Sequence, residues 1–269
     1  MGETYRLFDD WLSLGITAGM TTRFGGWSKP PYSSLNVGFH VGDDARRVLE
    51  NRKRIAFKLQ VPLENWVVAE QPHGTSIHKA TLDDAGKGAD SLDTAISGVD
   101  GLLTNRSGLL LVSLHADCVP LYFQSHKHHF VGIAHAGWKG TVGNIAGKMV
   151  ERFKEEGVVP HDLHVAIGPA IGRCCYEVSE DVIDYVSRLN LSEPVFEQNE
   201  NGKFMLDLKQ TNRQLLEKNG VPGGQISVSD QCTSCERDLF YSHRREKGKT
   251  GRMMAFIGMN LPLSKAEES

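Results

Sequence analysis

The stretches HADCVPLYF, residues 115–123, and FVGIAHAGWKGT, residues 130–141, carry the strongest structural signal in the chain. VPLYFQ (119–124) and FVGIAHA (130–136) are short runs rich in branched and aromatic residues and bounded by turn signals, and each predicts a β-strand. The polar segment SHKHH between them predicts a hairpin turn. Cys, Asp and His side chains at the ends of buried strands have a desolvation cost that packing does not explain. We therefore expect a functional site at these strand ends.

The run LLLVSLHA (109–116) directly precedes this hairpin and predicts a neighbouring strand. Downstream, apolar residues recur at helical spacing in TVGNIAGKMVERFKEEG (141–157), and Gly157 lies at the natural stop of the predicted amphipathic helix. Further strands are predicted in LHVAIGPAIG (163–172), QISVSD (225–230) and RMMAFIGM (252–259), and further helices in EDVIDYVSRLN (180–190) and DLKQTNRQLLEKNGV (207–221). The pattern is typical of a mixed α/β protein whose helices cover a substantial sheet.

Composition excludes several classes of protein. The chain has 269 residues, of which 40% are hydrophobic and 23% charged, as in ordinary globular proteins, and we find no repeat or linker that would divide residues 1–269 into two domains. A net charge of -3 argues against nucleic-acid binding. The N-terminus does not resemble a secretory signal, and no apolar run approaches the roughly 18 to 20 residues of a membrane span. The odd count of five cysteines favours reduced thiols in the cytoplasm.

Three residues form a candidate metal site. Cys118 and His135 lie at the two open ends of the predicted hairpin, so the turn between the strands brings them close together. His73, held between Pro72 and Gly74, is a better third ligand than His78, which lies on a segment expected to be exposed. Two imidazoles and one thiolate suit zinc and leave a fourth position for water or substrate, as in catalytic sites. The alternative is that each is an ordinary buried or hydrogen-bonded side chain.

The other four cysteines offer a weaker signal. Cys232 and Cys235 have C-x-x-C spacing, but a structural zinc would need Cys174 and Cys175 as its other two ligands. Because adjacent cysteines make awkward co-ligands, the sequence argues against a second zinc site.

Several basic residues are candidates for binding an anion. The run SHRREKGKTGR (242–252), which contains Arg244, is either a solvated loop or a phosphate-binding segment. Arg23, in the Gly/Pro-rich loop TTRFGGWSKPPY (21–32), is either a surface charge or an anion clamp. The turn containing Lys139 opens a helix whose N–H groups attract anions, although it lacks the spacing of a Walker loop.

A set of short motifs, taken together, resembles the YfiH/YlmD family, whose members are variously called multicopper polyphenol oxidases, laccase-domain proteins and purine nucleoside phosphorylases. The resemblance spans about residues 21–258. It rests on TTRFGGWS, SLNVGFHVGDD, Gln71-Pro72-His73-Gly74, HADCVPLYF, AHAGWKGT, IGPAIGRCCYEV and DQCTSCERDLFYSHRREKGKTGR.

The resemblance implies a single-domain layered α/β sandwich with a mixed sheet. It also implies a zinc ion held by His73, Cys118 and His135, the same three residues that the spacing favours, with copper as the metal that the oxidase names suggest. Arg23 belongs to the family's active site. Position 72, a proline here, varies among members.

The family's activities are phosphorolysis of adenosine, inosine and 5′-methylthioadenosine, and deamination of adenosine to inosine. Purine nucleosides and phosphate are therefore the expected substrates. For deamination, the metal would activate water to attack C6 of the purine, and the C6 amino group would leave as ammonia. For phosphorolysis, Arg23, Lys139 and Arg244 would position phosphate. The proton donor is one of Asp117, His115 and His243, and the protein is expected to be a monomer or a homodimer.

Other functions are weighed against this one. A laccase needs several H-x-H pairs, whereas HKHH (126–129) is the single such cluster. A cytidine-deaminase-type enzyme needs H-x-E and P-C-x-x-C, and both are absent. A hydrolase of amide bonds, with Cys118 as nucleophile and His135 as base, stays open. Some members of the resembling family are credited with correcting cell-wall peptides, so the resemblance also allows a hydrolase of cell-wall peptide that uses either the Cys nucleophile or zinc. A non-catalytic metal-binding protein is the remaining alternative.

Overall fold

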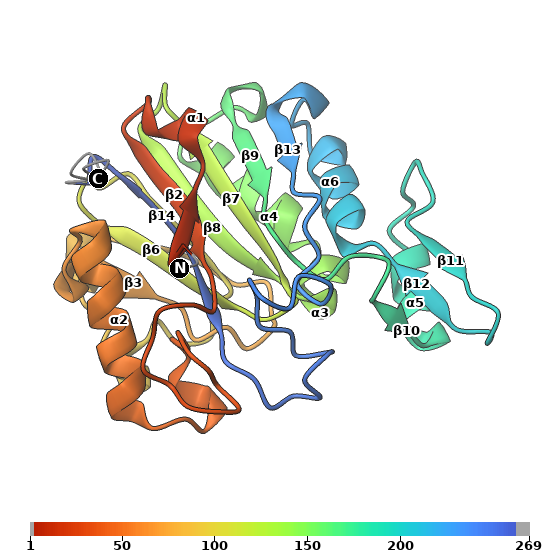
Figure 1. Ribbon diagram of the computed structural model, residues 1–269. Helices are drawn as coiled ribbons and strands as arrows, with labels where there is room; N and C mark the ends of the chain where they lie inside the picture. The colour runs from red at the N-terminus through yellow and green to blue at the C-terminus, as the bar shows by residue number, and fades with distance from the viewer. Residues whose placement is uncertain (1–2, 262–269) are drawn as a thin grey trace.

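The computed structural model describes residues 3–261 and consists of four layers, helix, sheet, sheet and helices (Figure 1). The mixed α/β class and the layered sandwich expected from the sequence are confirmed. Two mixed sheets pack face to face, and helices cover the outer face of each one. None of the helices within residues 3–261 is long and apolar enough to cross a membrane.

The first sheet has five strands, in which β3 runs parallel to β6 and the other neighbours are antiparallel. Its order is β1 (Tyr5–Leu7), β2 (Ile16–Thr21), β14 (Met253–Met259), β6 (Leu110–His115) and β3 (Trp66–Val68). The second sheet has six strands, and its edge pairs β13–β9 and β4–β5 are parallel. Its order is β13 (Ile226–Val228), β9 (His164–Ile167), β7 (Val119–Ser125), β8 (Phe130–Ala136), β5 (Gly101–Thr104) and β4 (Ile77–Lys79).

The strand over 109–116 does not neighbour the hairpin, contrary to expectation. The predicted hairpin forms, with Pro120 opposite His135, but β6 belongs to the other sheet. The chain passes between the sheets at Ala116, Asp117 and Cys118, where Asp117 adopts a positive φ of 91°. This crossing explains why polar residues interrupt the apolar run between β6 and β7. A segment that passes from one sheet to the other pairs with neither, so its backbone groups need other hydrogen-bond partners. We call these three residues the sheet corner.

Apolar side chains fill three interfaces. Between the sheets, Leu111 and Ile257 from the first sheet pack with Tyr122 and Ile133 from the second. Helix α2 (Ala45–Leu59) covers the first sheet, and helices α4 (Ile145–Glu155) and α6 (Leu208–Lys218) cover the second. The long apolar runs of the central strands follow from this arrangement, because those strands are buried on both faces.

The helix predicted over 141–157 is two helices, α3 (Trp138–Val142) and α4. Asn144 separates them with φ of 60°, and its side-chain oxygen accepts a hydrogen bond from Gly147 N, 3.1 Å away, as the N-cap of α4. Helix α3 therefore begins earlier than predicted, directly after the strand that carries His135.

A small antiparallel sheet and one helix project from the body (Figure 1). This arm contains β10 (Glu177–Val178), α5 (Glu180–Ser187), β11 (Phe196–Gln198) and β12 (Phe204–Leu206), while α1 (Asp9–Leu12) lies near the N-terminus. Short 3₁₀ helices span Phe39–Val41, Leu63–Asn65, Leu82–Asp84, Leu92–Thr94, Pro160–Asp162 and Gly223–Gln225. The remaining predicted helices and strands are present with shorter bounds, which is usual because element ends are the least regular part of an element.

Candidate active site

A cavity of about 440 Å³ opens beside the sheet corner, within the usual range of roughly 300 to 1,000 Å³ for small-molecule sites. Its lining contains both apolar and polar side chains. The apolar lining residues are Leu114, Ala116, Trp138, Ile171, Tyr176 and Leu208. The polar and charged lining residues are His40, Glu70, Gln71, Asp117, His243, Arg244 and Arg252, together with the three candidate metal ligands.

His73, Cys118 and His135 converge in this cavity. Their ligand atoms all lie within 4.8 Å of one another, and the rings of the two histidines meet edge to face with centroids 4.7 Å apart. Two imidazole nitrogens and a sulfur at this spacing fit the zinc donor set, and they also suit copper. The structure therefore brings together the three residues that the sequence selected.

Asp100 positions both histidines. Its Oδ1 lies 2.9 Å from Nδ1 of His135 and accepts a hydrogen bond from His73 N at 3.0 Å, while its Oδ2 accepts one from Gly74 N at 2.6 Å. The carboxylate is almost fully buried directly before β5, which pairs with the strand of His135. A ring nitrogen bonded to a carboxylate leaves the other nitrogen, Nε2, available for a metal, as in many zinc sites.

The turn that carries His73 is fixed by the backbone and by one side chain. Gln71 and His73 both have positive φ, 64° and 66°, a conformation that surrounding contacts must stabilise in residues other than glycine. The amide of Gln71 supplies such contacts, since it donates to Leu114 O at 2.9 Å and accepts from Leu114 N at 2.7 Å. Leu114 lies in β6, so His73 is tied to the first sheet and Cys118 to the start of the second.

Half-buried Cys118 and buried His135 form a polarised pair. Burial raises the pKa of the Cys118 thiol, but His135 and His73 outweigh burial and lower this pKa below its ordinary value. Burial lowers the pKa of His135, whereas the charges of Cys118 and Asp100 raise it, with a net rise. Cys118 is therefore stabilised as a thiolate, the form that binds a metal and that acts as a nucleophile.

Gly137, which has no side chain, provides the space in which the side chains of Cys118 and His73 meet. A Cβ at this position would lie 3.1 Å from Sγ of Cys118 and 3.1 Å from Cδ2 of His73. Its φ of -70° is open to any residue, so close approach rather than backbone conformation accounts for glycine here.

Two candidate proton donors are already engaged. Nδ1 of His115 faces Cys118 O at 3.0 Å and so carries its proton, while Nε2 lies 2.8 Å from the hydroxyl of Ser113. Burial, followed by His135, lowers the pKa of His115 well below its ordinary value, and this neutral ring does not line the cavity. His115 positions the backbone beside Cys118.

Asp117, at the cavity wall, accepts hydrogen bonds from the hydroxyls of Thr233 and Ser242, 2.7 and 3.0 Å away, and from Arg244 N at 2.7 Å. All three donors come from residues 229–252, which we call the β13–β14 loop. Asp117 therefore anchors this loop to the sheet corner.

The third candidate, His243, is exposed at the cavity wall, and its ring makes no hydrogen bond within the described part of the chain. Its imidazole is free to exchange a proton with a bound molecule.

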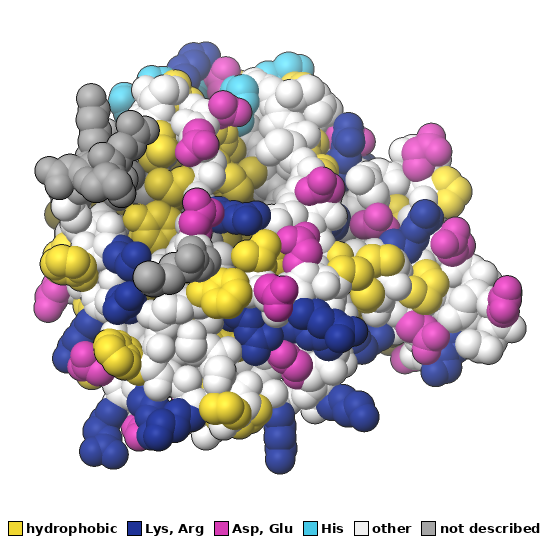
Figure 2. Space-filling model, viewed as in Figure 1, with side chains coloured by type: hydrophobic (Ala, Val, Ile, Leu, Met, Phe, Trp, Pro, Cys, Tyr) yellow, Lys and Arg dark blue, Asp and Glu magenta, His cyan; other side chains and the backbone are white. Residues whose placement is uncertain are grey.

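Arginine side chains of the β13–β14 loop supply positive charge. Arg244 and Arg252 line the cavity, and Figure 2 shows Lys and Arg side chains gathered over this loop. Arg244 lies 5.0 Å above the ring of Tyr176 and donates one hydrogen bond to Glu177 O at 2.7 Å. Arg252 donates through Nη1 to the carbonyls of its two preceding residues. Each guanidinium keeps further donors for an anion.

Arg23 and Lys139 do not line the cavity. The guanidinium of Arg23 donates to Ser33 O and Arg237 O and pairs with Glu246 at 3.0 Å, so its donors are directed at the protein. Lys139 is exposed, with Nζ 5.7 Å from the ring centre of Trp138. The active-site role of Arg23 stays a prediction of the family resemblance, and the structure gives this residue the role of bracing the β13–β14 loop.

A family model described as "Multi-copper polyphenol oxidoreductase laccase" matches residues 17–260. The chain belongs to this family. Its relatives and structural neighbours carry the YfiH and YlmD names, so the resemblance read from the motifs is confirmed.

Curated relatives of this YfiH/YlmD family member are similar over nearly their whole length. A protein of Geobacillus stearothermophilus named purine nucleoside phosphorylase YlmD is 51% identical over 247 residues, which cover 91% of this chain and 90% of that one. A protein of Bacillus subtilis with the same name is 46% identical over 246 residues, covering 91% and 88%.

Solved structures share the fold. YfiH of Bacillus licheniformis superposes with a TM-score of 0.93 at 49% identity, covering 96% of this chain and 97% of that one. YlmD of Geobacillus stearothermophilus gives 0.89 at 51% identity, covering 91% and 92%. The Neisseria meningitidis protein NMB0706 gives 0.81 at 29% identity, covering 96% and 100%.

Asp100, Gln71 and Arg252 are among the residues of this family member's site that sequence reasoning missed. Asp100 directly precedes a buried strand in GVDGLLT, which is a signal of the same kind that identified Cys118. Gln71 stands out in the sequence only as part of the Gln71-Pro72-His73-Gly74 motif, and its pairing with Leu114 depends on the neighbouring strand. Arg252 lay at the end of the basic run, with nothing in the spacing to separate it from the solvated residues there.

Proposed function

We propose that this protein is a zinc-dependent purine nucleoside phosphorylase whose active site is the cavity at the sheet corner. The observation that carries the proposal is the convergence of His73, Cys118 and His135 in one cavity. The same cavity is lined by two arginines, Arg244 and Arg252, and by two aromatic side chains, Trp138 and Tyr176. The names of relatives as much as 51% identical support the substrate class. A Zn²⁺ ion held by the three residues supplies a Lewis acid next to the substrate.

The cavity lining offers groups for both substrates. Trp138, together with the face of Tyr176 that Arg244 does not cover, offers a flat apolar surface on which a purine stacks. Arg244 and Arg252 supply donors and positive charge for phosphate, a role that forked guanidinium groups fill well. Phosphate held there attacks the anomeric carbon as the bond to the purine breaks, and holding both reactants together removes much of the entropic barrier.

The departing purine needs a proton. His243 is our choice among the three predicted donors, because Asp117 and His115 spend their polar atoms on contacts within the protein. His243 donates the proton to the purine as it leaves, and solvent restores it. Arg23 and Lys139, the other predicted phosphate ligands, would reach the cavity only after rearrangement of their present contacts.

We also propose the finer activities that the family resemblance implies: phosphorolysis of adenosine, inosine and 5′-methylthioadenosine, and deamination of adenosine to inosine. The open side of the donor set supports both reactions, since it leaves space for a reactant beside the metal.

A thiol hydrolase is the second candidate, favoured by one specific observation. Cys118, His135 and Asp100 form a chain of nucleophile, base and orienting carboxylate. The metal proposal accounts in addition for His73, whose position such a hydrolase would leave without a role. A hydrolase of amide bonds, including cell-wall peptides, would remain active after metal removal.

Incubation of the purified protein with adenosine, with and without phosphate, tests the proposal. Adenine that forms only with phosphate indicates phosphorolysis, and inosine indicates deamination. We expect His73→Ala to lose activity and the metal ion held by His73, Cys118 and His135, while the matched variant His126→Ala, an exposed histidine of the β7–β8 turn, keeps both. If the wild-type protein contains metal but converts no nucleoside, the phosphorylase proposal is wrong, and a non-catalytic metal-binding protein becomes the better interpretation.

A further inference from the structure

A second group of thiols lies outside the active-site cavity. Cys174 and Cys175 follow β9, and Cys232 and Cys235 follow β13. These two strands are parallel neighbours, so the segments after them leave the sheet at the same end. A bridge between Ala170 and Cys232 continues the parallel pairing beyond the strands. The topology of the sheet thus brings together two cysteine pairs from distant parts of the sequence.

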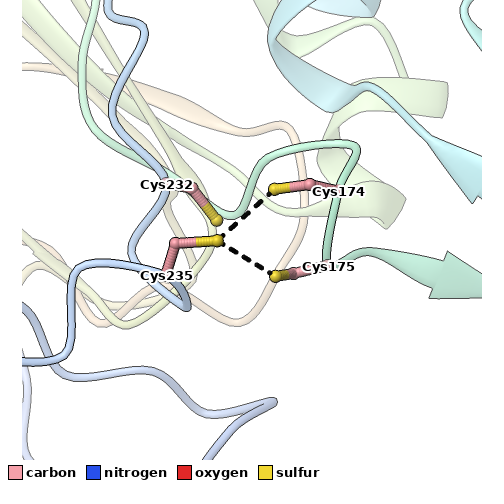
Figure 3. Close-up of side chains that lie close together, drawn as sticks. All are labelled: Cys174, Cys175, Cys232 and Cys235. Atoms are coloured by element: carbon pink, nitrogen blue, oxygen red, sulfur yellow. Dashed lines mark hydrogen bonds between the residues drawn. The ribbon is translucent and has the colours of Figure 1, made fainter.

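The four sulfur atoms converge on one point (Figure 3). Sγ of Cys235 lies 3.6 Å from Sγ of Cys174 and 3.4 Å from Sγ of Cys175, and all four sulfurs lie within 4.8 Å of one another. Tetrahedral zinc with Zn–S bonds of about 2.3 Å places its sulfurs roughly 3.8 Å apart. The spacing of the thiols matches that geometry.

Neither of the two common alternatives explains the cluster. Packing of cysteine as a small apolar residue requires burial, yet Cys174 and Cys235 are exposed. A disulfide joins two sulfurs at about 2.05 Å and has no need of a third or fourth. The cysteines are free thiols, and Cys235 approaches two partners at once.

The surrounding groups suit a negatively charged metal–thiolate centre. Gly172 N donates a hydrogen bond to Sγ of Cys232 at 3.2 Å, and the C-x-x-C turn is closed by Cys235 N donating to Cys232 O at 3.1 Å. Arg173, Lys209 and Arg213 line a cavity together with Cys174 and Cys232, and Asp207 and Asp230 line it too. Three cations against two carboxylates leave a small positive excess beside the thiols.

We propose that Cys174, Cys175, Cys232 and Cys235 bind one Zn²⁺ ion in a closed, four-coordinate structural site. The sequence argued against it because Cys174 and Cys175 are adjacent, but the tight turn in which they lie, with Cys175 N donating to Gly172 O at 3.0 Å, directs both side chains toward Cys235 (Figure 3). Four protein ligands leave no position for substrate, which distinguishes a structural zinc from a catalytic one.

The site clamps the β13–β14 loop. Cys232 and Cys235 lie near the start of this loop, which then reaches Asp117 through Thr233 and carries Arg244 to the active-site cavity. The zinc would therefore hold in place the segment that supplies the cavity with positive charge. Such a role is independent of whether the cavity performs phosphorolysis.

Metal content and X-ray absorption test the proposal. We expect two zinc ions per wild-type chain and one in Cys118→Ala, whose remaining zinc shows four sulfur neighbours at about 2.3 Å. Cys235→Ser should lose one ion per chain, whereas the matched change Ser234→Ala, in the same turn, should keep both. Cys174→Ser, at an exposed position, repeats the measurement should Cys235→Ser fail to fold.

Two results would overturn the proposal. One is a Cys118→Ala protein that holds no zinc, or whose zinc has nitrogen or oxygen neighbours. The other is disulfide formation: the chain has five cysteines, so two disulfides would leave one thiol titratable after denaturation with chelator, whereas the zinc site leaves five. Since Cys118→Ala removes only the first donor set, failure of the structural site and failure of the phosphorylase give different results.

Discussion

At the scale of single residues, the active site depends on a carboxylate that does not face the substrate. Asp100 accepts hydrogen bonds from the backbone on either side of the His73 ring and bonds Nδ1 of His135, so one buried group orients two of the three candidate ligands. Groups that orient ligands in this way commonly contribute as much to metal affinity as a weak ligand does.

Asp100→Asn should weaken metal binding by about 10- to 100-fold, because the amide replaces one accepting oxygen with a donor that faces the existing N–H groups. Competition with a chromophoric chelator measures the affinity. The matched variant Asp162→Asn also breaks a pair with a histidine, 2.8 Å from Nε2 of His128, but lies outside the site and should leave the affinity unchanged. If Asp100→Asn binds the metal as tightly as Asp162→Asn does, Asp100 does not orient the two histidine ligands as proposed.

Gly137→Ala should reduce metal affinity and activity without unfolding the protein. The added methyl group would crowd Sγ of Cys118 and the ring of His73, each 3.1 Å away, while the backbone conformation suits alanine. Gly224→Ala is the control, because no heavy atom lies within 4 Å of its Cβ. Circular dichroism checks the fold, and a fully active Gly137→Ala protein would show that the ligands have more room than the structure gives them.

The three candidate ligands could be selected from the sequence because two of them flank a hairpin, and a hairpin fixes which residues face each other. Arg23 and Lys139 show the limit of the same reasoning. Both lie near the right motifs, but the direction of a long side chain depends on partners such as Glu246, which are distant in sequence. Asp100 was missed for the same reason, since the pairing of β5 with β8 gives it its partner.

At the scale of elements, the sheet corner and the β13–β14 loop form one unit. Glu246 braces the loop from within, pairing with Arg23 and Arg245 and accepting hydrogen bonds from Ser242 N and the Thr250 hydroxyl. The strands themselves were largely predictable from their apolar runs. The assignment of β6 to the opposite sheet was not, because a sheet crossing and a hairpin turn interrupt an apolar run in the same way.

The loop should loosen in acid, as judged by the free energy of unfolding. Burial raises the pKa of Glu246, but its hydrogen bonds and the arginines outweigh burial and lower it. A lowered folded-state pKa stabilises the protein above the unfolded-state pKa of about 4.3, and this contribution is lost as pH falls through the folded-state value. Glu246→Gln should therefore reduce the dependence of stability on pH below about pH 4.5.

Denaturant titrations at several pH values measure this dependence, with exposed Glu64→Gln as the control. If Glu246→Gln and Glu64→Gln retain the same acid-induced loss of stability as the wild type, the ionised Glu246 does not brace the loop.

At the scale of the whole molecule, the projecting arm shares a core with the body. Val182 and Ile183 of α5 and Leu206 of β12 belong to the same apolar cluster as Met149 of α4 and Leu215 of α6. The lack of a linker in the sequence predicts a single domain, and single-domain organisation stays a prediction that this shared cluster makes testable. The four-layer stacking could not be predicted from the sequence, because it depends on which sheet each strand joins.

A shared core predicts cooperative unfolding. Calorimetry of the metal-loaded protein should give one transition, in which fluorescence of Trp138, near the arm, and of Trp66, under α2, changes at the same temperature. Single-tryptophan variants separate the two signals. Two well-resolved transitions would contradict the single-domain prediction.

Zinc-dependent phosphorolysis is tested most directly by following adenosine and phosphate consumption as metal is removed from the protein and restored. We expect adenine and ribose 1-phosphate to form in equal amounts with the zinc-loaded protein. Their formation should stop after chelation and return when zinc is added to the wild type but not to Cys118→Ala. Undiminished phosphorolysis by the stripped protein, or by Cys118→Ala, would contradict this expectation.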